Sequence, residues 1–241
     1  MHFFLDPDFA PNTALLTASE SRHAHTVLRL SPEEHILVGD GRGALYTCRI
    51  LGEQKGALLL EILEQRLEAE ALPKLSIAMG ITKQAARFEW FAEKACELGI
   101  SGIIPMLSTH CERKHFNDKR LQKILLSASK QSRRAHLPTL HPLMDMDEVL
   151  RLEADAKYIA HCHSERNRIP LARVLLQSKA AHQLILIGPE GDFSVKELEK
   201  ARAAACTEIS LGDLRLRTET AGVYAAALAS AFAKMDETKQ S

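Results

Sequence analysis

From residue 74 onward the chain alternates between strand-like and helix-like segments. Short apolar runs typical of buried strands lie at residues 75–79, 103–104, 157–162, 183–187 and 208–211. The segments between them have the apolar spacing of helices. Strands that alternate with helices form a mostly parallel sheet with helices on its faces. The pattern therefore predicts an α/β domain.

Several helices in this part have recognisable ends. A helix predicted over residues 88–98 is followed by Gly99, the residue type that most often ends a helix in the left-handed conformation. Ser194 and Glu197 have the spacing of a capping box for a helix that runs to Ala205. Further helices are expected over residues 117–132 and 220–234. The last is alanine-rich, so we expect another element to pack closely against it.

The first seventy residues follow a different pattern. Glycine-containing turns separate strand-like runs at residues 35–38, 44–51 and 57–63, and one helix is expected over residues 19–30. Three short strands are not stable alone, so residues 3–5 and another segment should complete a small β-barrel. The polar stretch before Pro73 separates the two patterns. We therefore expect a β domain over residues 1–70 and an α/β domain over residues 74–241.

Composition limits the environment of the chain. No run of about 18 apolar residues is present, and no signal-peptide pattern follows Met1, so a cytoplasmic protein is expected. The five cysteines are scattered without a CxxC motif, which argues against a disulfide framework and a structural zinc site. The formal net charge is zero, so composition alone does not indicate a nucleic-acid partner.

Charge is nevertheless unevenly distributed. Between residues 113 and 134 only Asp118 opposes a cluster of basic side chains. The cluster consists of Arg113, Lys114, Lys119, Arg120, Lys123, Lys130, Arg133 and Arg134. Such a run fits contacts with nucleic-acid phosphates, although a solvated helix face is the more common role.

Two glycine-containing loops follow the last two predicted strands. Residues 187–194 read IGPEGDFS, and residues 211–221 read LGDLRLRTETA. Open α/β sheets bind ligands at the carboxyl ends of their strands. Glu190 and Asp192 would repel a phosphate at the start of the next helix, so an uncharged or cationic ligand fits better. The second loop also fits an ordinary turn in which Thr218 or Thr220 caps a helix.

These paired loops resemble the C-terminal motifs of the RsmE family, which methylates uridine N3 in 16S rRNA. Residues 83–100, residues 130–138 and the N-terminal segments 2–4 and 23–29 are also similar to that family, so the resemblance spans nearly the whole chain. The sequence departs from it at two positions. Family members often carry glycine where this chain has Asp192 and glutamate where it has Lys130.

The resemblance implies a particular fold and set of partners. It implies a PUA-like β-barrel that binds RNA, followed by a SPOUT domain with a deep C-terminal trefoil knot. The implied cofactor is S-adenosylmethionine, held in a pocket of the knot, and the implied assembly is a homodimer. The implied partner is 16S rRNA, in the 30S subunit or a late assembly intermediate. No metal is needed for methyl transfer to a nitrogen atom.

The resemblance also assigns residues to sites. One side of the cofactor pocket would consist of Leu186, Gly188, Pro189, Glu190 and Gly191. The other side would consist of Leu211, Gly212, Leu214, Leu216 and Thr218. Contacts with RNA would come from His23, His25, Arg29, Arg113, Lys114, Arg133 and Arg134.

Two side chains are candidates for the chemistry. Arg217 would stabilise the uridine anion, because a guanidinium is always charged and donates in a fixed geometry. Glu219 would orient Arg217 or accept the imide proton. Their alternative roles are a salt bridge between Arg217 and either Glu219 or a partner subunit, and a helix-capping role for Glu219.

Other functions remain open at the level of sequence. A noncatalytic RNA-binding protein could keep the same fold, although such a protein would have no need of Gly188, Gly191 and Gly212. A SPOUT methyltransferase could also act on another RNA. A nucleotide-dependent enzyme of the doubly wound type is disfavoured, because the GxGxxG and GxxxxGK[ST] patterns are absent.

Overall fold

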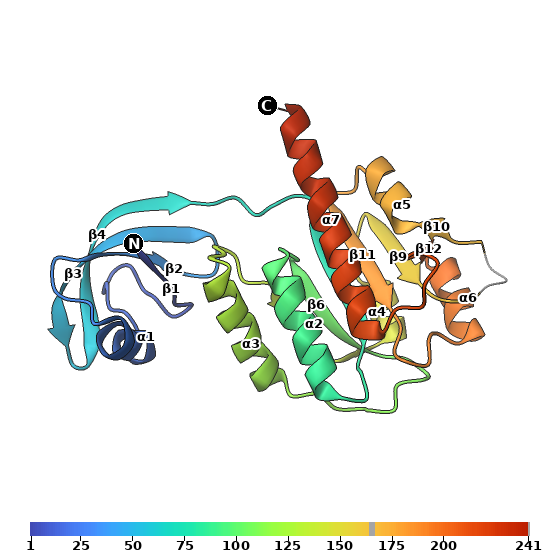
Figure 1. Cartoon of the computed structure of the whole chain (residues 1–241), viewed down its shortest axis with the longest axis horizontal. Coiled ribbons are helices and arrows are strands. Elements are labelled where there is room, and N and C mark those ends of the chain that lie inside the picture. The colour runs from blue at the N-terminus through green and yellow to red at the C-terminus, as the bar shows by residue number, and fades with distance from the viewer. Residues whose placement is uncertain (164–166, 241) are drawn as a thin grey trace. The chain divides into compact units, whose positions relative to one another are not determined.

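The computed structural model describes residues 1–163 and 167–240, with side chains described as far as residue 233. The chain divides into two compact units. Unit 1 contains Met1–Glu70 together with Ser129–Leu137, and unit 2 contains Ala71–Ala128 together with Pro138–Ser241. Figure 1 labels the helices and strands of both units.

Unit 1 is built on a four-stranded sheet in the order β1-β2-β3-β4. Its strands are β1 (His2–Leu5), β2 (His35–Gly39), β3 (Ala44–Gln54) and β4 (Ala57–Leu67). β1 runs parallel to β2, whereas the other two pairings are antiparallel. Leu15 adds an isolated bridge to Leu59 of β4, and Phe4, Leu16 and Ile50 are fully buried in the core of this unit.

The helix predicted over residues 19–30 is confirmed as an α-helix only in its first part. The structure has a short α-helix, α1 (Ala18–His23), that continues as a π-helical turn, η1 (Ala24–Leu28). The wider turn buries Ala24 and Leu30, which are joined by a backbone hydrogen bond of 3.1 Å, and leaves Val27 64% exposed. Packing of these two residues, rather than helical periodicity, therefore sets the local backbone.

A segment from the middle of the chain completes unit 1. The backbone nitrogen of Gly43 donates to the carbonyl of Ala135 at 3.1 Å, and that of Leu137 donates to Gly41 at 2.9 Å. The Nε2 atom of His136 lies 2.7 Å from the carbonyl oxygen of Glu68. Residues 129–137 thus belong to this unit although they follow the first strands of unit 2 in the chain.

Unit 2 contains an eight-stranded sheet in the order β10-β12-β9-β11-β5-β6-β7, with β8 paired to β6. Every recorded pairing in it is parallel, which confirms the predicted α/β fold. Its strands are β5 (Lys74–Gly80), β6 (Gly102–Leu107), β7 (Thr139–Leu140), β8 (Met144–Asp145), β9 (Ala156–Ala160), β10 (Ile169–Pro170), β11 (His182–Ile187) and β12 (Thr207–Ser210).

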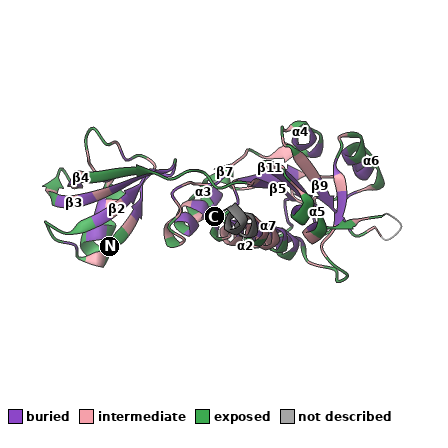
Figure 2. Cartoon of the chain, turned by 90° about the horizontal axis from the view of Figure 1, so that it is seen from above, coloured by how far each residue is buried: buried purple, intermediate pink, exposed green. Residues whose placement is uncertain are grey.

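Helices cover both faces of this sheet, as Figure 2 shows. They are α2 (Ala85–Glu97), α3 (Asp118–Gln131), α4 (Met146–Arg151), α5 (Leu171–Gln177), α6 (Val195–Ala203) and α7 (Thr218–Gln240). Apolar side chains of α2, α3, α5 and α7 form one core with the sheet, and those of α4 and α6 form a second core on the other face. No helix within the described residues is both long enough and apolar enough to cross a membrane.

Several predicted helix ends are confirmed. Gly99 follows the last residues of α2 with a φ of 92°, and Ser194 and Glu197 form the capping box of α6. The cap predicted at Thr218 or Thr220 is wrong, because the carbonyl of Arg217 already accepts the first helical bond of α7, from Ala221 at 2.8 Å. The tight packing expected of this alanine-rich helix is confirmed, since a Cβ added at Gly222 would lie 2.6 Å from the ring of Phe91 in α2.

Candidate functional site: a pocket at the ends of three strands

A cavity of about 350 Å³ lies at the carboxyl ends of β9, β11 and β12. These three strands are neighbours in the sheet, so the loops that follow them meet at one edge. They are the β9 loop (residues 161–163), the β11 loop (residues 188–193) and the β12 loop (residues 211–217). The position and the volume are those of small-molecule sites in open α/β sheets.

The β11 loop is held closely by its surroundings. A Cβ added at Gly80 would lie 2.6 Å from the nitrogen of Pro189, and a Cβ added at Gly191 would lie 2.7 Å from the Cβ of His110. Glu190 Oε1 accepts a hydrogen bond from the backbone nitrogen of Lys83 at 3.2 Å. The loop therefore has little freedom to change its path.

The β12 loop has the opposite character. Leu214 is 83% exposed, and Arg215 and Arg217 are also exposed. No side chain of this loop makes a hydrogen bond or an ion pair with any residue that the structure describes. Gly212 has a φ of +117°, a conformation that other residues rarely adopt. The loop thus presents the apolar Leu214 and the cationic Arg215 and Arg217 at its surface, whereas Leu211 and Leu216 pack against the core.

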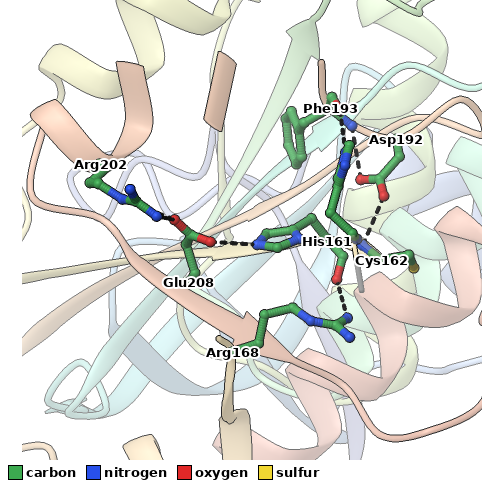
Figure 3. Close-up of polar contacts among 8 residues, drawn as sticks. His161, Cys162, Arg168, Asp192, Phe193, Arg202 and Glu208 are labelled. Atoms are coloured by element: carbon green, nitrogen blue, oxygen red, sulfur yellow. Dashed lines mark hydrogen bonds and ion pairs between the residues drawn. The ribbon is translucent and has the colours of Figure 1, made fainter. Parts of the chain in front are cut away.

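The β9 loop, which sequence reasoning did not assign to the site, forms a third side through His161 and Cys162. Figure 3 shows its contacts. The buried His161 ring places Nε2 3.0 Å from Glu208 Oε2, while its Nδ1 lies 3.3 Å from the backbone nitrogen of His163. Because Nδ1 accepts from that N–H, the proton of the neutral ring belongs on Nε2, where it is donated to Glu208.

Electrostatics agree with this tautomer. Burial lowers the pKa of His161 despite its contact with the Glu208 carboxylate. Burial alone would raise the pKa of Glu208, but the hydrogen bonds from Arg202 and His161 outweigh it, so the pKa is lowered. Arg202 Nη2 approaches Glu208 Oε1 at 2.8 Å. A neutral imidazole and an ionised carboxylate therefore join the β9 loop to β12.

Arg87 of α2 is a second residue of the pocket that the sequence reasoning missed. Its guanidinium lies between two carboxylates, with Nη1 3.6 Å from Glu190 Oε1 and Nε 3.7 Å from Glu219 Oε1. Glu219 is only 8% exposed, and its Oε2 is buried without a hydrogen-bond partner among the described residues. The ion pair of Glu219 is thus with Arg87, and the structure records none between Glu219 and Arg217.

Most of the predicted cofactor residues lie on the wall of the cavity. They are Gly188, Pro189, Glu190, Leu211, Gly212, Leu214, Leu216 and Thr218. Arg217 lines it too, whereas Glu219 is not among the lining residues but pairs with Arg87, which is. Gly191 faces His110. Leu186 does not line the cavity, because alternate residues of a strand face opposite sides of the sheet, and Leu186 packs on the side of α4 and α6.

The predicted RNA contacts are not among the residues that line the cavity. His23, His25, Arg29, Arg133 and Arg134 belong to unit 1. Arg113 and Lys114 belong to unit 2 and follow β6. Two other members of the basic cluster already have acidic partners, since Arg120 contacts Glu89 at 2.6 Å and Lys130 pairs with Glu20.

The chemistry of the cavity wall restricts what it can bind. Its apolar part comes from Ile187, Leu211 and Leu216, and glycine backbone adjoins this part. Carboxylates of Glu190 and Asp192 and several arginines surround it. Such a pocket fits a molecule that combines a flat, uncharged ring with separate cationic and anionic groups.

Comparison with known proteins gives a consistent result. Residues 69–230 match the family described as the RNA methyltransferase domain, and residues 16–63 match the RNA methyltransferase PUA domain. The ribosomal RNA small subunit methyltransferase E of Rickettsia conorii is 28% identical over 228 residues, which cover 93% of this chain and 92% of the relative.

Solved structures are similar over the same length. The crystal structure of a probable rRNA-methyltransferase from Porphyromonas gingivalis has a TM-score of 0.90 and 31% identity, covering 98% of this chain and 100% of the other. The crystal structure of a ribosomal RNA small subunit methyltransferase E from Neisseria gonorrhoeae, bound to S-adenosyl methionine, has a TM-score of 0.73 and 27% identity. The match covers 99% of this chain and 98% of the other. The methyltransferase match includes all three loops of the cavity.

Proposed function

This chain belongs to the RNA methyltransferase family, and from that premise we propose that it methylates N3 of a uracil in the 16S rRNA of the small ribosomal subunit. The methyl donor is S-adenosylmethionine. The observation that carries the proposal is the cavity between the β11 and β12 loops, whose residues match the motifs of the RsmE family.

The residues of the cavity fit this donor. Its adenine is flat and uncharged, which suits the apolar residues Leu211 and Leu216 and the glycine backbone beside them. Its amino-acid end carries one cationic and one anionic group, and the cavity offers the carboxylate of Glu190 and the guanidinium of Arg168. When bound, the donor supplies a methyl group on a positively charged sulfur, which a nucleophilic nitrogen displaces in line.

The chain itself supplies charge and orientation for the acceptor. Uracil N3 becomes nucleophilic as it loses its proton, and negative charge then spreads over the ring. Arg217 is our candidate for stabilising that charge, and its exposure on the cavity wall without a recorded partner among the described residues supports this role. Glu219, with its unpartnered Oε2, is the candidate acceptor for the imide proton, and Arg87 holds its other oxygen.

Unit 1 is proposed as a part of the chain that binds RNA. Its PUA match supports this role, as do the exposed side chains of His23, His25 and Arg29 around the π-helical turn. We retain residues 1–70 as the RNA-binding domain and residues 74–241 as the methyltransferase domain in this proposal. Residues 129–137 are structurally part of the former.

The basic cluster gives a direct test of RNA binding. Lys114, Lys119 and Lys123 are exposed, so each is available to neutralise a phosphate. Replacing all three with Gln should flatten the dependence of log K on log salt by roughly 2–3 units. The control is the double variant Lys94→Gln, Lys200→Gln. Both lysines already form ion pairs within the chain, so their replacement should leave the salt dependence unchanged. Equal slopes in the wild type, the triple variant and the control would show that the basic cluster is a solvated surface that does not contact RNA.

Assembly and location form the remaining part of the proposal. We propose a cytoplasmic homodimer with a trefoil knot at the cofactor pocket, acting on the 30S subunit or a late assembly intermediate. Light scattering should report about twice the 26.8 kDa mass of one chain. A monomer that stays fully active at nanomolar concentration would exclude an active site shared between subunits.

One experiment tests the proposed function as a whole. Ribosomal RNA from a strain that lacks the gene should be without 3-methyluridine in its 16S rRNA, and the gene should restore it. The alternatives predict other outcomes. A noncatalytic RNA-binding protein would leave every modified nucleoside in place, and a methyltransferase for another RNA would remove a different one.

A further inference from the structure

Asp192 occupies a backbone position that usually requires glycine. Its φ is +63°, in the left-handed region where side chains other than Asp and Asn are rare. The RsmE family often has glycine at this position, which adopts such a conformation without cost. An aspartate at this position is therefore best explained by a contact of its side chain.

The carboxylate of Asp192 joins two loops of the pocket. Figure 3 shows that Oδ2 accepts a hydrogen bond from the backbone nitrogen of Cys162, at 2.8 Å, while Oδ1 accepts one from the backbone nitrogen of Phe193, also at 2.8 Å. Phe193 belongs to the β11 loop and Cys162 to the β9 loop. Hydrogen bonds to an ionised carboxylate are stronger than those between neutral groups.

The same two loops are joined at a second point nearby. His163 Nε2 lies 2.8 Å from the carbonyl oxygen of Phe193. The neighbouring His161 fixes the β9 loop to β12 through Glu208. Among the hydrogen bonds that the structure records, those of the Asp192 carboxylate and of the His163 ring link the β9 loop to the β11 loop.

We propose that Asp192 is a positioning residue that holds the β9 and β11 loops at a fixed separation before the cofactor binds. The inference rests on the proposed function, in which S-adenosylmethionine occupies the cavity that both loops border. By holding the Cys162 amide, Asp192 removes the need to order the β9 loop during binding, and a preordered site binds more tightly. A glycine here gives the same backbone path without the link.

Asp192→Gly is the sharpest variant, because it keeps the left-handed backbone and removes only the carboxylate. Relief of the unfavourable φ opposes the loss of the two hydrogen bonds, so the melting temperature should change little. Hydrogen exchange at the Cys162 amide of the ligand-free protein should be at least about tenfold faster, and S-adenosylmethionine should bind roughly tenfold more weakly by calorimetry. KM for the cofactor should rise while kcat at saturation is retained.

Two further variants complete the test. Asp192→Asn keeps the side-chain shape but turns one acceptor into a donor that faces an N–H group. Like Asp192→Gly, it should therefore exchange the Cys162 amide faster and bind S-adenosylmethionine more weakly. Asp147→Asn is the matched control. Asp147 is ion-paired with Lys200 between α4 and α6, and its loss should change neither the exchange at Cys162 nor cofactor binding.

The outcomes separate the inference from the function on which it rests. Unchanged exchange at Cys162 in Asp192→Gly would overturn the inference, and so would a loss of affinity matched by an equal loss of folding stability. A wild-type protein that does not bind S-adenosylmethionine would overturn the proposed function. The exchange measurement needs no ligand, so it decides the role of Asp192 in either case.

Discussion

The β11 and β12 loops border the same cavity, yet they are held in opposite ways. In the β11 loop, Glu190 and Asp192 accept hydrogen bonds from the backbone of other segments, and the Nδ1 atom of His110 lies 2.9 Å from the carbonyl oxygen of Asp192. In the β12 loop, Leu211 and Leu216 pack against the core of unit 2, but no side chain between Leu211 and Arg217 makes a hydrogen bond or an ion pair with any residue that the structure describes.

This difference indicates a division of labour. A loop whose shape is set before binding can recognise a ligand at low entropic cost, so the β11 loop should determine cofactor affinity. Exposed cationic side chains without polar partners are free to contact the second substrate, so the cationic side chains of the β12 loop should determine turnover. Each prediction below changes one loop and asks whether the effect falls on affinity, turnover or stability.

The largest effect is expected from Arg217→Ala in the β12 loop. If the guanidinium stabilises negative charge on uracil, its loss should lower kcat by roughly 10²–10³. Cofactor affinity should barely change, because a cationic sulfonium gains nothing from a nearby guanidinium. Single-turnover kinetics and calorimetry separate the two quantities.

Two comparisons keep this prediction specific. Arg217→Lys retains the charge but loses the forked donor geometry, so an intermediate rate is expected. Higher pH should partly rescue the Ala variant, since more of the uracil is then already deprotonated. The assignment fails if Arg217→Ala keeps wild-type turnover or is inactive only because a substrate no longer binds.

Gly212→Val tests whether the β12 loop acts through its backbone shape as well. A Cβ at this position meets no atom within 4 Å, so the protein has room for it, but the φ of +117° excludes a β-branched residue. The loop must therefore take another path, and we expect S-adenosylmethionine affinity to fall by about 10–100-fold with the fold intact. Unchanged affinity for S-adenosylmethionine would indicate that the β12 loop contributes to the chemical step and not to cofactor binding.

Glu190→Gln changes the β11 loop by a single charge. The amide oxygen can still accept from Lys83, but the ion pair with Arg87 is lost. Both side chains are partly exposed, so a loss of affinity of only about two- to fivefold is expected, with kcat retained. Glu199→Gln, on the exposed face of α6, is the control. A large fall in kcat instead would move Glu190 into the catalytic machinery.

The smallest expected effect concerns acid stability beside the β9 loop. The pKa of His161 is lowered from 6.5, so the unfolded chain takes up a proton below that pH while the folded protein resists it. Stability should fall as the pH drops from 6.5 toward the folded pKa of His161. Because the pKa of Glu208 is also lowered, the protein should lose further folding stability as the pH falls below 4.5.

The measurement is the melting temperature at pH 7 and pH 5.5. The wild type should lose roughly 2–4 °C more than His161→Gln, which keeps a polar side chain but cannot titrate. Arg217→Ala should follow the wild type, because this variant retains His161. Identical pH dependence in wild type and His161→Gln would exclude His161 as the origin.

Local signals in the sequence predicted much of this structure. The Ser194 and Glu197 capping box and the left-handed Gly99 depend only on neighbours within a few residues, so spacing was enough to find them. The β11 and β12 loops were found because glycine and charge follow buried strands. The parallel sheet followed from the alternation of strand and helix.

Features that depend on distant contacts were not predicted. Arg87 enters the pocket only because α2 packs against α7, and nothing near Arg87 in the sequence encodes that packing. His161 lies within a strand that was predicted over residues 157–162, but its partner Glu208 lies 47 residues later. The π-helical turn reflects burial of Ala24 and Leu30 and not the periodicity around them. The order of strands in the sheet likewise cannot be predicted from the periodicity of apolar residues.

The strand order has a consequence for biosynthesis. β5 lies between β6 and β11, so one edge of it stays unpaired until residues 182–187 have been made, about 100 residues after β5 itself. At roughly 5–20 residues per second, that interval lasts on the order of 5–20 s. The three strands that end at the cavity are all made after residue 155, so a nascent chain cannot form the complete cavity until β12 (Thr207–Ser210) and the loop after it have been made.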